Sequence, residues 1–239
     1  MKKYLEKVFG KTQKEFFELV ESNIKRDKKM FIITANPETL MIGVNSPDFN
    51  QVLLEDDVTI TPDGIGVVKA LSMLNMDVEE RITGVDIARH LLDVGNQNQK
   101  SIYLYGAKPE VLDAFVAKIK NEYADLVVLG AKDGYHNVDD DVFLDIVEKK
   151  PDIVLIALGI PRQELLIHKY YNQMEKGIFV GVGGTFDVLS GTKKRAPKFF
   201  IKMNLEWLYR IAKEPKRFNR FYKSNIQFMK LVNRLKREG

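Results

Sequence analysis

The chain has 239 residues, of which 45% are hydrophobic and 29% are charged, so it can bury the core of one large domain. It contains no cysteine, which excludes a disulfide framework and thiolate chemistry. The N-terminus lacks the apolar segment of a signal peptide, and no run of about 18 apolar residues predicts a membrane span, so we expect a cytoplasmic protein.

The sequence predicts strands that alternate with helices. Thr12 and Glu15 have the spacing of a capping box, which predicts a first helix over residues 12–27. Strands are expected at residues 30–34, 58–61, 101–105, 126–129, 152–158 and 178–182, and helices at about 37–45, 47–57, 65–75, 84–94, 109–123 and 139–149. Residues 130–135 are expected to form a loop. This alternation predicts an α/β, Rossmann-like fold with a mainly parallel sheet and helices on both faces.

The charges are distributed unevenly along the chain. Residues 193–239 contain 15 Lys and Arg against 3 Asp and Glu, whereas residues 1–192 contain 22 against 30. We therefore divide the chain into a Rossmann-like catalytic domain, 1–192, and a basic helical C-terminal appendage, 193–239. A basic segment on an acidic body indicates an anionic partner, such as nucleic acid, anionic lipid or phosphate.

Four of the predicted strands end in glycine-rich or polar segments. These segments contain Thr34 and Asn36, Asp63 and Gly64, residues 159–163, and residues 183–187. The carboxyl ends of parallel strands lie at one edge of a sheet, where α/β proteins bind their ligands. The sequence therefore predicts a binding cleft at this edge.

Asp63 is the candidate catalytic base, because it follows a strand directly and precedes a glycine-rich turn. The alternative is that Asp63 only caps the next helix, and local sequence alone favours the cap. The convergence of three other strand ends on the same edge favours catalysis. One carboxylate can serve both purposes.

The glycines do not complete a known nucleotide fingerprint. Gly64 and Gly66 lack the third glycine of a dinucleotide site, because Lys69 stands in its place. Gly181 and Gly183 lack it as well, and no P-loop pattern occurs. A nucleotide or sugar-nucleotide diphosphate held by backbone amides at helix N-termini remains open.

Neither a metal site nor a catalytic triad is expected. Residues 139–141 are three consecutive aspartates, but they stand where a helix begins, and the helix dipole favours carboxylates there. The three histidines lack ligand spacing, and no serine lies in a G-x-S-x-G elbow.

Two further polar residues each have two interpretations. Arg81 can neutralise a phosphate with a bidentate contact or form a surface salt bridge. Gln163 can donate a hydrogen bond to a leaving phosphate or a sugar hydroxyl, although the first turn of a helix is the simpler interpretation.

The basic appendage is predicted to form amphipathic helices. Its apolar stripes are Phe199, Phe200, Met203, Trp207, Leu208 and Ile211, then, after Pro215, Phe218, Phe221, Tyr222, Met229, Val232 and Leu235. Basic helices with aromatic residues suit a membrane interface, and packing on the core or on a second subunit is the alternative. Nucleic acid is disfavoured, because no recognised binding module is present.

Taken together, the motifs resemble the WecG/TagA/CpsF family of bacterial glycosyltransferases over about residues 12–225. The segments that carry the resemblance are Thr34-Ala35-Asn36, Thr61-Pro62-Asp63-Gly64-Ile65-Gly66, Arg81-Ile82-Thr83-Gly84-Val85-Asp86, Gly159-Ile160-Pro161-Arg162-Gln163-Glu164, Gly181-Val182-Gly183-Gly184-Thr185-Phe186-Asp187, Arg195-Ala196-Pro197 and Glu206-Trp207-Leu208-Tyr209-Arg210, followed by Glu214, Pro215 and Arg217.

The resemblance implies an activity. The expected reaction moves an N-acetylmannosamine-type sugar from a UDP donor to undecaprenyl-diphosphate-linked N-acetylglucosamine, for cell-wall teichoic acid or surface polysaccharide. Inversion at the anomeric carbon, no metal and no cofactor are implied as well. The appendage would engage the inner face of the cell membrane.

The resemblance also implies roles for individual residues. Asp63 would be the general base, and Thr34, Asn36, Arg81 and Gln163 would share its catalytic pocket. Substrate-binding residues would be Gly64, Gly106, Gly159, Pro161, Gly183, Gly184, Phe186 and Asp187. The lipid diphosphate and the membrane would meet Arg195, Arg210, Arg217 and Arg220.

Several alternatives remain open at this stage. N-acetylmannosaminuronic acid or glucose can replace N-acetylmannosamine as the donor sugar. A nucleotide-dependent dehydrogenase is the rival enzyme, and a lipid- or nucleic-acid-binding protein is the rival without enzymatic activity. An apolar face under the appendage would suit a homo-oligomer.

Overall fold

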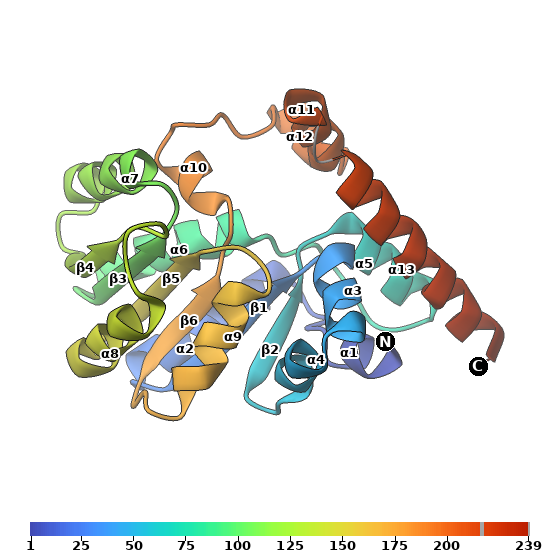
Figure 1. Ribbon diagram of the computed structural model, residues 1–239, viewed down its shortest axis with the longest axis horizontal. Helices are drawn as coiled ribbons and strands as arrows, with labels where there is room; N and C mark the ends of the chain where they lie inside the picture. The colour runs from blue at the N-terminus through green and yellow to red at the C-terminus, as the bar shows by residue number, and fades with distance from the viewer. Residues whose placement is uncertain (216–217, 239) are drawn as a thin grey trace.

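One parallel sheet organises the chain (Figure 1). The computed structural model describes residues 1–215 and 218–238, apart from the side chains of Arg210 and Arg220. The strands are β1 (Lys29–Ala35), β2 (Val58–Pro62), β3 (Ser101–Gly106), β4 (Val127–Lys132), β5 (Ile153–Ala157) and β6 (Gly177–Gly181). They lie in the order β2-β1-β6-β5-β3-β4, and each neighbouring pair is parallel. The predicted α/β class is confirmed.

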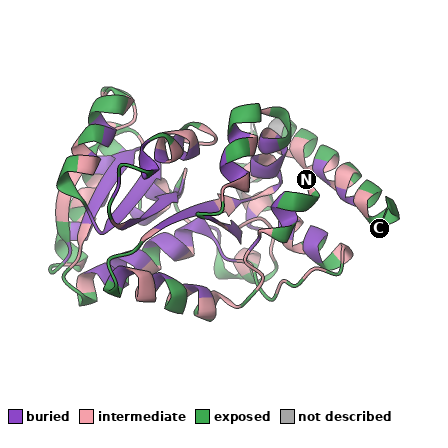
Figure 2. Cartoon of the chain, turned by 90° about the horizontal axis from the view of Figure 1, so that it is seen from below, coloured by how far each residue is buried: buried purple, intermediate pink, exposed green. Residues whose placement is uncertain are grey.

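Helices cover both faces of the sheet. One face packs against α1 (Lys2–Glu6), α3 (Pro37–Asn45), α4 (Pro47–Leu54), α5 (Ile65–Met73), α8 (Asp139–Lys149) and α9 (Arg162–Tyr171). The other packs against α2 (Gln13–Lys25), α6 (Gly84–Gln97), α7 (Pro109–Glu122) and α10 (Thr185–Leu189). Strands β5 and β6 are therefore buried at every position, and Figure 2 shows the interior strands as buried, whereas the edge strand β4 is partly exposed.

Local sequence sets several helix starts. Thr12 and Glu15 form the predicted capping box before α2. Asn36 caps α3, and Pro37 occupies the first helical position, where its missing N–H is no loss. Thr83 caps α6 by accepting a hydrogen bond from the backbone of Asp86. The caps at Asn36 and Thr83 fix where β1 and the segment after β2 turn away from the sheet.

The predicted loop at residues 130–135 is wrong in its first half. β4 continues through Lys132, and Gly130 pairs with Tyr103 of β3. A Cβ added at Gly130 would lie 2.2 Å from the Tyr103 ring, so glycine is needed there for space. Glycine in this strand marks a close approach of side chain to backbone rather than a turn.

The C-terminal appendage contains α11 (Lys198–Lys202), α12 (Glu206–Lys213) and α13 (Phe218–Glu238). In Figure 1, α11 and α12 lie above one edge of the sheet, and α13 runs down beside α3 and α5. Phe228 and Val232 of α13 are fully buried in the core under these helices. The packing interpretation therefore holds for one face of α13, and Phe228 is an anchor that the predicted stripe omitted.

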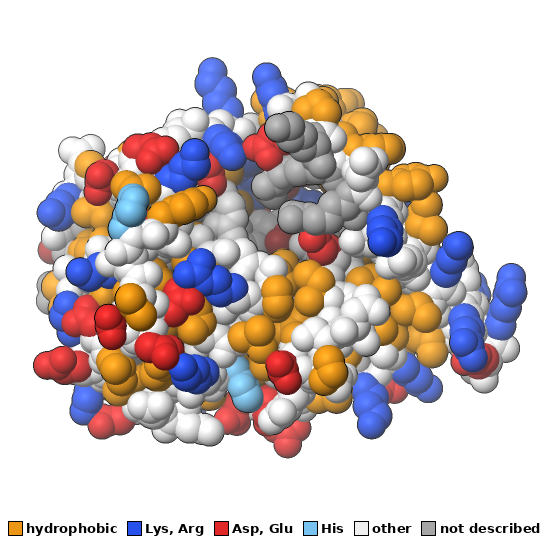
Figure 3. Space-filling view, viewed as in Figure 1, with side chains coloured by type: hydrophobic (Ala, Val, Ile, Leu, Met, Phe, Trp, Pro, Cys, Tyr) orange, Lys and Arg blue, Asp and Glu red, His pale blue; other side chains and the backbone are white. Residues whose placement is uncertain are grey.

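Another face of the appendage is apolar and exposed. Its exposed side chains are Phe199, Met203, Leu208, Phe218 and Tyr222, with Lys198, Lys202, Lys213 and Lys223 among them. Figure 3 shows hydrophobic side chains gathered over α11 to α13 at the upper right, with basic side chains nearby. We call this set of nine residues the apolar–basic surface. Among the described residues, no helix has the length and apolarity needed to cross a membrane.

Candidate active site

The ends of four neighbouring strands meet at one edge of the sheet. Thr34 of β1 pairs with Thr61 of β2, and Ile33 pairs with Gly181 of β6. Gly181 also pairs with Ile156 of β5. The segments that follow these strands therefore leave the sheet side by side, as the sequence predicts.

A cleft of about 490 Å³ opens at this edge, beside β1 and β2. One side, which we call the sheet wall, is lined by Asn36, Pro37, Glu38, Asp63, Gly64, Ile65, Gly66, Lys69 and Arg81. The opposite side, the appendage wall, is lined by Glu206, Trp207, Ile211, Phe221, Asn225 and Met229. Charged and amide groups thus face a largely aromatic and apolar surface.

Asp63 lies in the sheet wall and is partly exposed. Its backbone N–H donates to the carbonyl oxygen of Ala35 at 2.9 Å, which ties the end of β2 to the end of β1. Gly64 is the N-cap of α5, and no side chain caps that helix. The carboxylate of Asp63 is therefore not the helix cap that local sequence favours.

Gly64 and Gly66 allow α5 to start close to α3. A Cβ at Gly64 would lie 2.9 Å from the Cβ of Asn36, and one at Gly66 would lie 2.6 Å from Cγ of Pro37. Larger residues would push the two helix starts apart. Part of the glycine pattern that suggested phosphate binding therefore has a packing cause.

Asn36 and Thr34 hold the end of β1. The Oδ1 of Asn36 accepts from the backbone N–H groups of Glu38 and Thr39. Its Nδ2 group makes no hydrogen bond within the described part of the chain and remains a donor for the cleft. The Oγ1 of Thr34 donates to the carbonyl oxygen of Gly181 at 3.1 Å, and Thr34 does not line the cleft.

Arg81 lies between the two walls. Its Nη2 donates to Oε2 of Glu206 at 3.3 Å, and both side chains are largely buried. The ion pair joins the sheet wall to the first residue of α12. Arg81 therefore makes a salt bridge, the second of its two interpretations. The bridge lies inside the cleft rather than on the surface.

Arg195 is largely buried and does not belong to the apolar–basic surface, which corrects its expected place at the membrane, whereas its contact with a lipid diphosphate stays a prediction. Its side chain is 16% exposed and forms a bidentate pair with Asp86, with N–O distances of 2.7 and 3.2 Å. Burial disfavours the charge on Asp86, but hydrogen bonds from Arg195 and Thr83 outweigh it and hold the pKa of Asp86 below its ordinary value. Burial lowers the pKa of Arg195, but the hydrogen bond and charge of Asp86, together with the charges of Glu206 and Asp63, outweigh burial and raise that pKa above its ordinary value, so the guanidinium stays charged.

Gln163 is buried behind the cleft rather than in its lining. Its Oε1 accepts from the backbone N–H groups of Gly159 and Gly183, which joins the loops after β5 and β6. Its Nε2 donates to Oε1 of Glu164 at 2.7 Å. Glu164 is buried as well, and burial raises its pKa to about 7. Both residues shape the strand-end framework.

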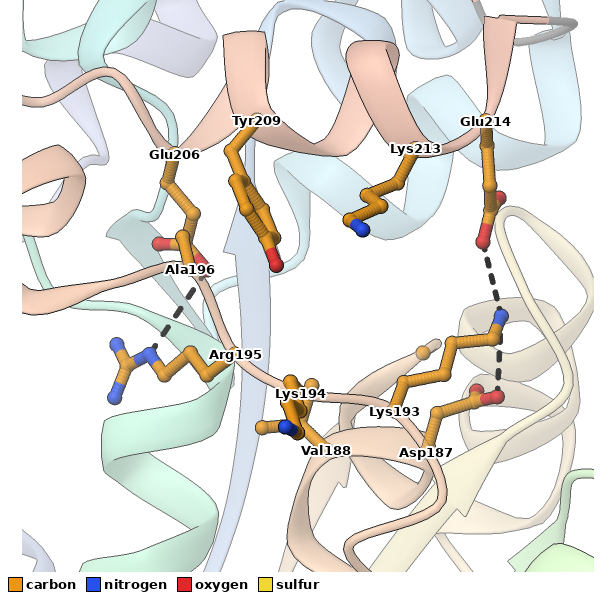
Figure 4. A pocket seen from close by; sticks show the side chains of 11 residues that line it. Asp187, Val188, Lys193, Lys194, Arg195, Ala196, Glu206, Tyr209, Lys213 and Glu214 are labelled. Atoms are coloured by element: carbon orange, nitrogen blue, oxygen red, sulfur yellow. Dashed lines mark hydrogen bonds and ion pairs between the residues drawn. The ribbon is translucent and has the colours of Figure 1, made fainter.

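A second cavity of about 290 Å³ lies on the other side of Glu206 (Figure 4). The loop after β6 and helix α10 contribute Gly184, Asp187 and Val188 to its lining. The connecting segment between α10 and α11 contributes residues 193–196. Helix α12 and the residue after it contribute Glu206, Tyr209, Lys213 and Glu214. In Figure 4 the side chains of Tyr209 and Lys213 project from α12 toward the connecting segment. Lys193 bridges Asp187 and Glu214 at 3.2 and 3.0 Å.

Several predicted substrate-binding residues lie outside both cavities. Phe186 is fully buried against Phe115, so its side chain is closed to a substrate, which corrects the prediction. Gly106 belongs to β3, where a Cβ would meet the backbone of Ala157 at 2.5 Å, so its role is close packing. Gly159, Pro161 and Gly183 belong to the loops joined by Gln163 and line neither cavity.

Three predicted residues of the appendage are not placed. Arg217 lies outside the described residues, as do the side chains of Arg210 and Arg220. No group of three or more His, Cys, Asp or Glu in the described part of the chain could hold a metal ion.

Sequence reasoning missed Glu206 and Trp207 as site residues. Glu206 is one of three acidic residues in the basic appendage, and it is buried. Trp207 stacks on Phe221 with ring centroids 5.0 Å apart. Glu206 is the single acidic residue of α12 and stands at the start of that basic helix. This position is the sequence signal that could have identified the site.

Comparison with known proteins identifies the family of this chain. A model of the glycosyl transferase WecG/TagA/CpsF family matches residues 5–239. A Bacillus subtilis protein is 42% identical over 189 residues, 79% of this chain and 73% of its own length. A Bacillus spizizenii protein is 39% identical over 197 residues, 82% and 76% respectively. A Staphylococcus aureus protein is 33% identical over 210 residues, 87% and 82%.

All three relatives are named N-acetylglucosaminyldiphosphoundecaprenol N-acetyl-beta-D-mannosaminyltransferase. The family match covers nearly the whole chain, including the sheet edge and the appendage that form the cleft. The chain belongs to the WecG/TagA/CpsF family of glycosyl transferases.

Proposed function

We propose that this enzyme transfers N-acetylmannosamine from a UDP donor to undecaprenyl-diphosphate-linked N-acetylglucosamine. The transfer inverts the anomeric carbon and serves the synthesis of teichoic acid or another surface polysaccharide. The names of the relatives support the acceptor and the transferred sugar. The observation that carries the proposal is the cleft, in which Asp63 and Arg81 face an aromatic and apolar wall.

Asp63 acts as the general base. An inverting transfer needs one group to take the proton from the attacking hydroxyl of the acceptor while UDP leaves from the opposite face of the donor sugar. Asp63 lies in the cleft on a rigid strand end, and α5 does not use its carboxylate as a cap. The amide of Asn36 offers a donor to a sugar hydroxyl beside it.

Cationic side chains stabilise the charge that develops on the leaving diphosphate. Arg81 lies in the cleft, and Lys193, Lys194 and Lys213 line the second cavity. We assign the nucleotide to this second cavity, near Gly184 and Asp187, and the acceptor sugar to the larger cleft. We expect no requirement for a metal ion, so turnover should survive a chelator such as EDTA.

The apolar–basic surface brings the enzyme to the inner face of the cell membrane, where a polyprenyl acceptor resides. Exposed aromatic and basic side chains on α11 to α13 have the composition of an interfacial surface. Each Lys or Arg near an anionic leaflet contributes about 1 kcal/mol. The appendage wall of the cleft belongs to the same segment, so membrane binding and acceptor capture share one element.

A donor screen tests the proposal. UDP release is measured with UDP-N-acetylmannosamine, UDP-N-acetylmannosaminuronic acid and UDP-glucose, each with a soluble lipid-diphosphate-N-acetylglucosamine analogue. We expect acceptor-dependent release with UDP-N-acetylmannosamine. Faster release with another sugar would reassign the donor, and oxidation of NADH without UDP release would favour the rival dehydrogenase.

A further inference from the structure

Glu206 brings a carboxylate against two arginines at the junction of the two cavities. It is the first residue of α12, its side chain is 7% exposed, and it lines both cavities. Oε2 accepts from Nη2 of Arg81 at 3.3 Å. Oε1 lies 3.9 Å from Nε of Arg195, which is too far for a hydrogen bond.

The two guanidinium groups offer more donors than Glu206 satisfies. Asp86 holds Nη1 and Nη2 of Arg195, but Nε of Arg195 is buried and has no hydrogen-bond partner in the described part of the chain. Arg81 makes one side-chain hydrogen bond there, to Glu206. A buried donor without an acceptor is costly, so this site is only partly filled by its own carboxylate.

A diphosphate suits these donors better than a carboxylate does. It carries more charge and more acceptor oxygens, and arginine pairs with phosphate in bidentate geometry. Asp63 and Asp86 also lie near these arginines, so every added carboxylate charge weakens the attraction for an anionic substrate. Glu206 and a diphosphate therefore compete for the same donors.

The position of Glu206 links this competition to the cleft. Its neighbour Trp207 stacks on Phe221 in the appendage wall, with 8° between the ring planes. At the other end of α12, the Lys193–Glu214 pair is far more exposed, so water screens it more strongly. Release of Glu206 frees the first turn of α12.

We propose that Glu206 is a built-in competitor, which occupies the Arg81–Arg195 site in the empty enzyme and is displaced by the diphosphate of a substrate. Displacement shifts the start of α12 and, with it, Trp207. This inference rests on the proposed function, because it assumes that the diphosphate of a substrate binds where the two cavities meet.

Calorimetry with UDP and with inorganic pyrophosphate tests the competition. Glu206→Gln keeps the shape of the side chain and removes its charge, so we expect it to bind both ligands about tenfold more tightly than the wild type. Glu175→Gln is the matched control, because it removes a charge from the exposed Lys150–Glu175 pair, outside both cavities. Unchanged or weaker binding by Glu206→Gln would overturn the inference.

Fluorescence of Trp207, the single tryptophan of the chain, tests the movement. Pyrophosphate does not absorb where tryptophan is excited, so saturating the wild type with it should shift the emission directly. The ligand-free Glu206→Gln protein should already show the shifted emission. The wild-type measurement needs no variant, and a bound state with unchanged emission would overturn the inference even if the variant failed to fold.

The outcomes separate this inference from the proposed function. In one outcome, the enzyme releases UDP from the donor, while Glu206→Gln binds UDP and pyrophosphate no more tightly than the wild type does. That result would overturn the inference and leave the proposed function intact. Tighter pyrophosphate binding by Glu206→Gln without any UDP binding would support the competition and overturn the proposed donor.

Discussion

The two walls of the cleft differ in what holds them in place. The sheet wall is tied by backbone hydrogen bonds between the ends of β1 and β2 and by the cap at Asn36. Within the described residues, side chains hold the appendage wall to the rest of the protein, through the Arg81–Glu206 pair and the buried face of α13. The Trp207–Phe221 stack joins α12 to α13 within that wall. The sheet wall is thus fixed by the fold, whereas the appendage wall is docked against it. We propose that catalysis belongs to the fixed sheet wall and that adjustment to a lipid-borne acceptor belongs to the docked appendage wall.

The largest expected effect concerns the sheet wall. Asp63→Asn should reduce turnover by about 10²–10⁴-fold, the range of general-base catalysis, while UDP binding stays near wild type. The variant should still fold, because Asn keeps the shape of the side chain and Gly64, not Asp63, is the N-cap of α5. Rates are measured as UDP release and binding by calorimetry. Turnover close to the wild-type rate would remove Asp63 as the base.

The position of the appendage wall depends on Phe228, which anchors α13 in the core. Phe228 is fully buried, so Phe228→Ala should lower the free energy of unfolding by about 3–5 kcal/mol. Tyr222 lies on the same helix and is 56% exposed, so Tyr222→Ala should change stability by no more than about 0.5 kcal/mol. Urea unfolding measures both. Equal effects would show that α13 is not docked in solution.

The support behind the fixed wall is sensitive to pH. Burial raises the pKa of Glu164 from 4.5 to about 7, so between these values the folded chain holds a proton that the unfolded chain has released. This contribution is complete below the unfolded pKa and is lost as the pH rises through the folded one. The stability advantage that disappears is on the order of 3 kcal/mol.

Glu164→Gln should remove that slope, since its Oε1 can still accept from Gln163. Urea unfolding of both proteins at about pH 5 and pH 8 measures the difference, because the two values bracket the titration. Parallel pH profiles for wild type and variant would contradict a raised pKa at Glu164.

The smallest expected effect concerns the outer face of the appendage. Phe199 and Met203 are 66% and 57% exposed, and replacing both by Ser should weaken binding to anionic vesicles by about tenfold. Tyr135→Ser is the control, because Tyr135 is 68% exposed in the loop after β4, outside the appendage. Vesicle sedimentation measures both. Sedimentation of the double variant like the wild type would separate the apolar–basic surface from membrane binding.

The local pattern of the sequence determined most of the fold. Apolar runs, capping residues and prolines act within a few residues, so they predicted the α/β class, the six strands and the starts of α2 and α3. The parallel arrangement also brought Asn36, Asp63 and Arg81 to one edge. Gly130 led to the wrong prediction of a loop. Glycine stands there because the ring of Tyr103, a residue far away in sequence, leaves no room for a Cβ.

Only the tertiary structure decided what each polar residue does. Gln163 and Phe186 stand in motifs that suggest substrate contact, yet one is buried in the strand-end framework and the other lies in the core. Arg195, which was expected at the membrane, pairs with Asp86 instead. The site also depends on Glu206, which is 125 residues from Arg81 in sequence. Such contacts form only when separate elements pack, because a charge pair or a buried ring has no periodic signature in sequence.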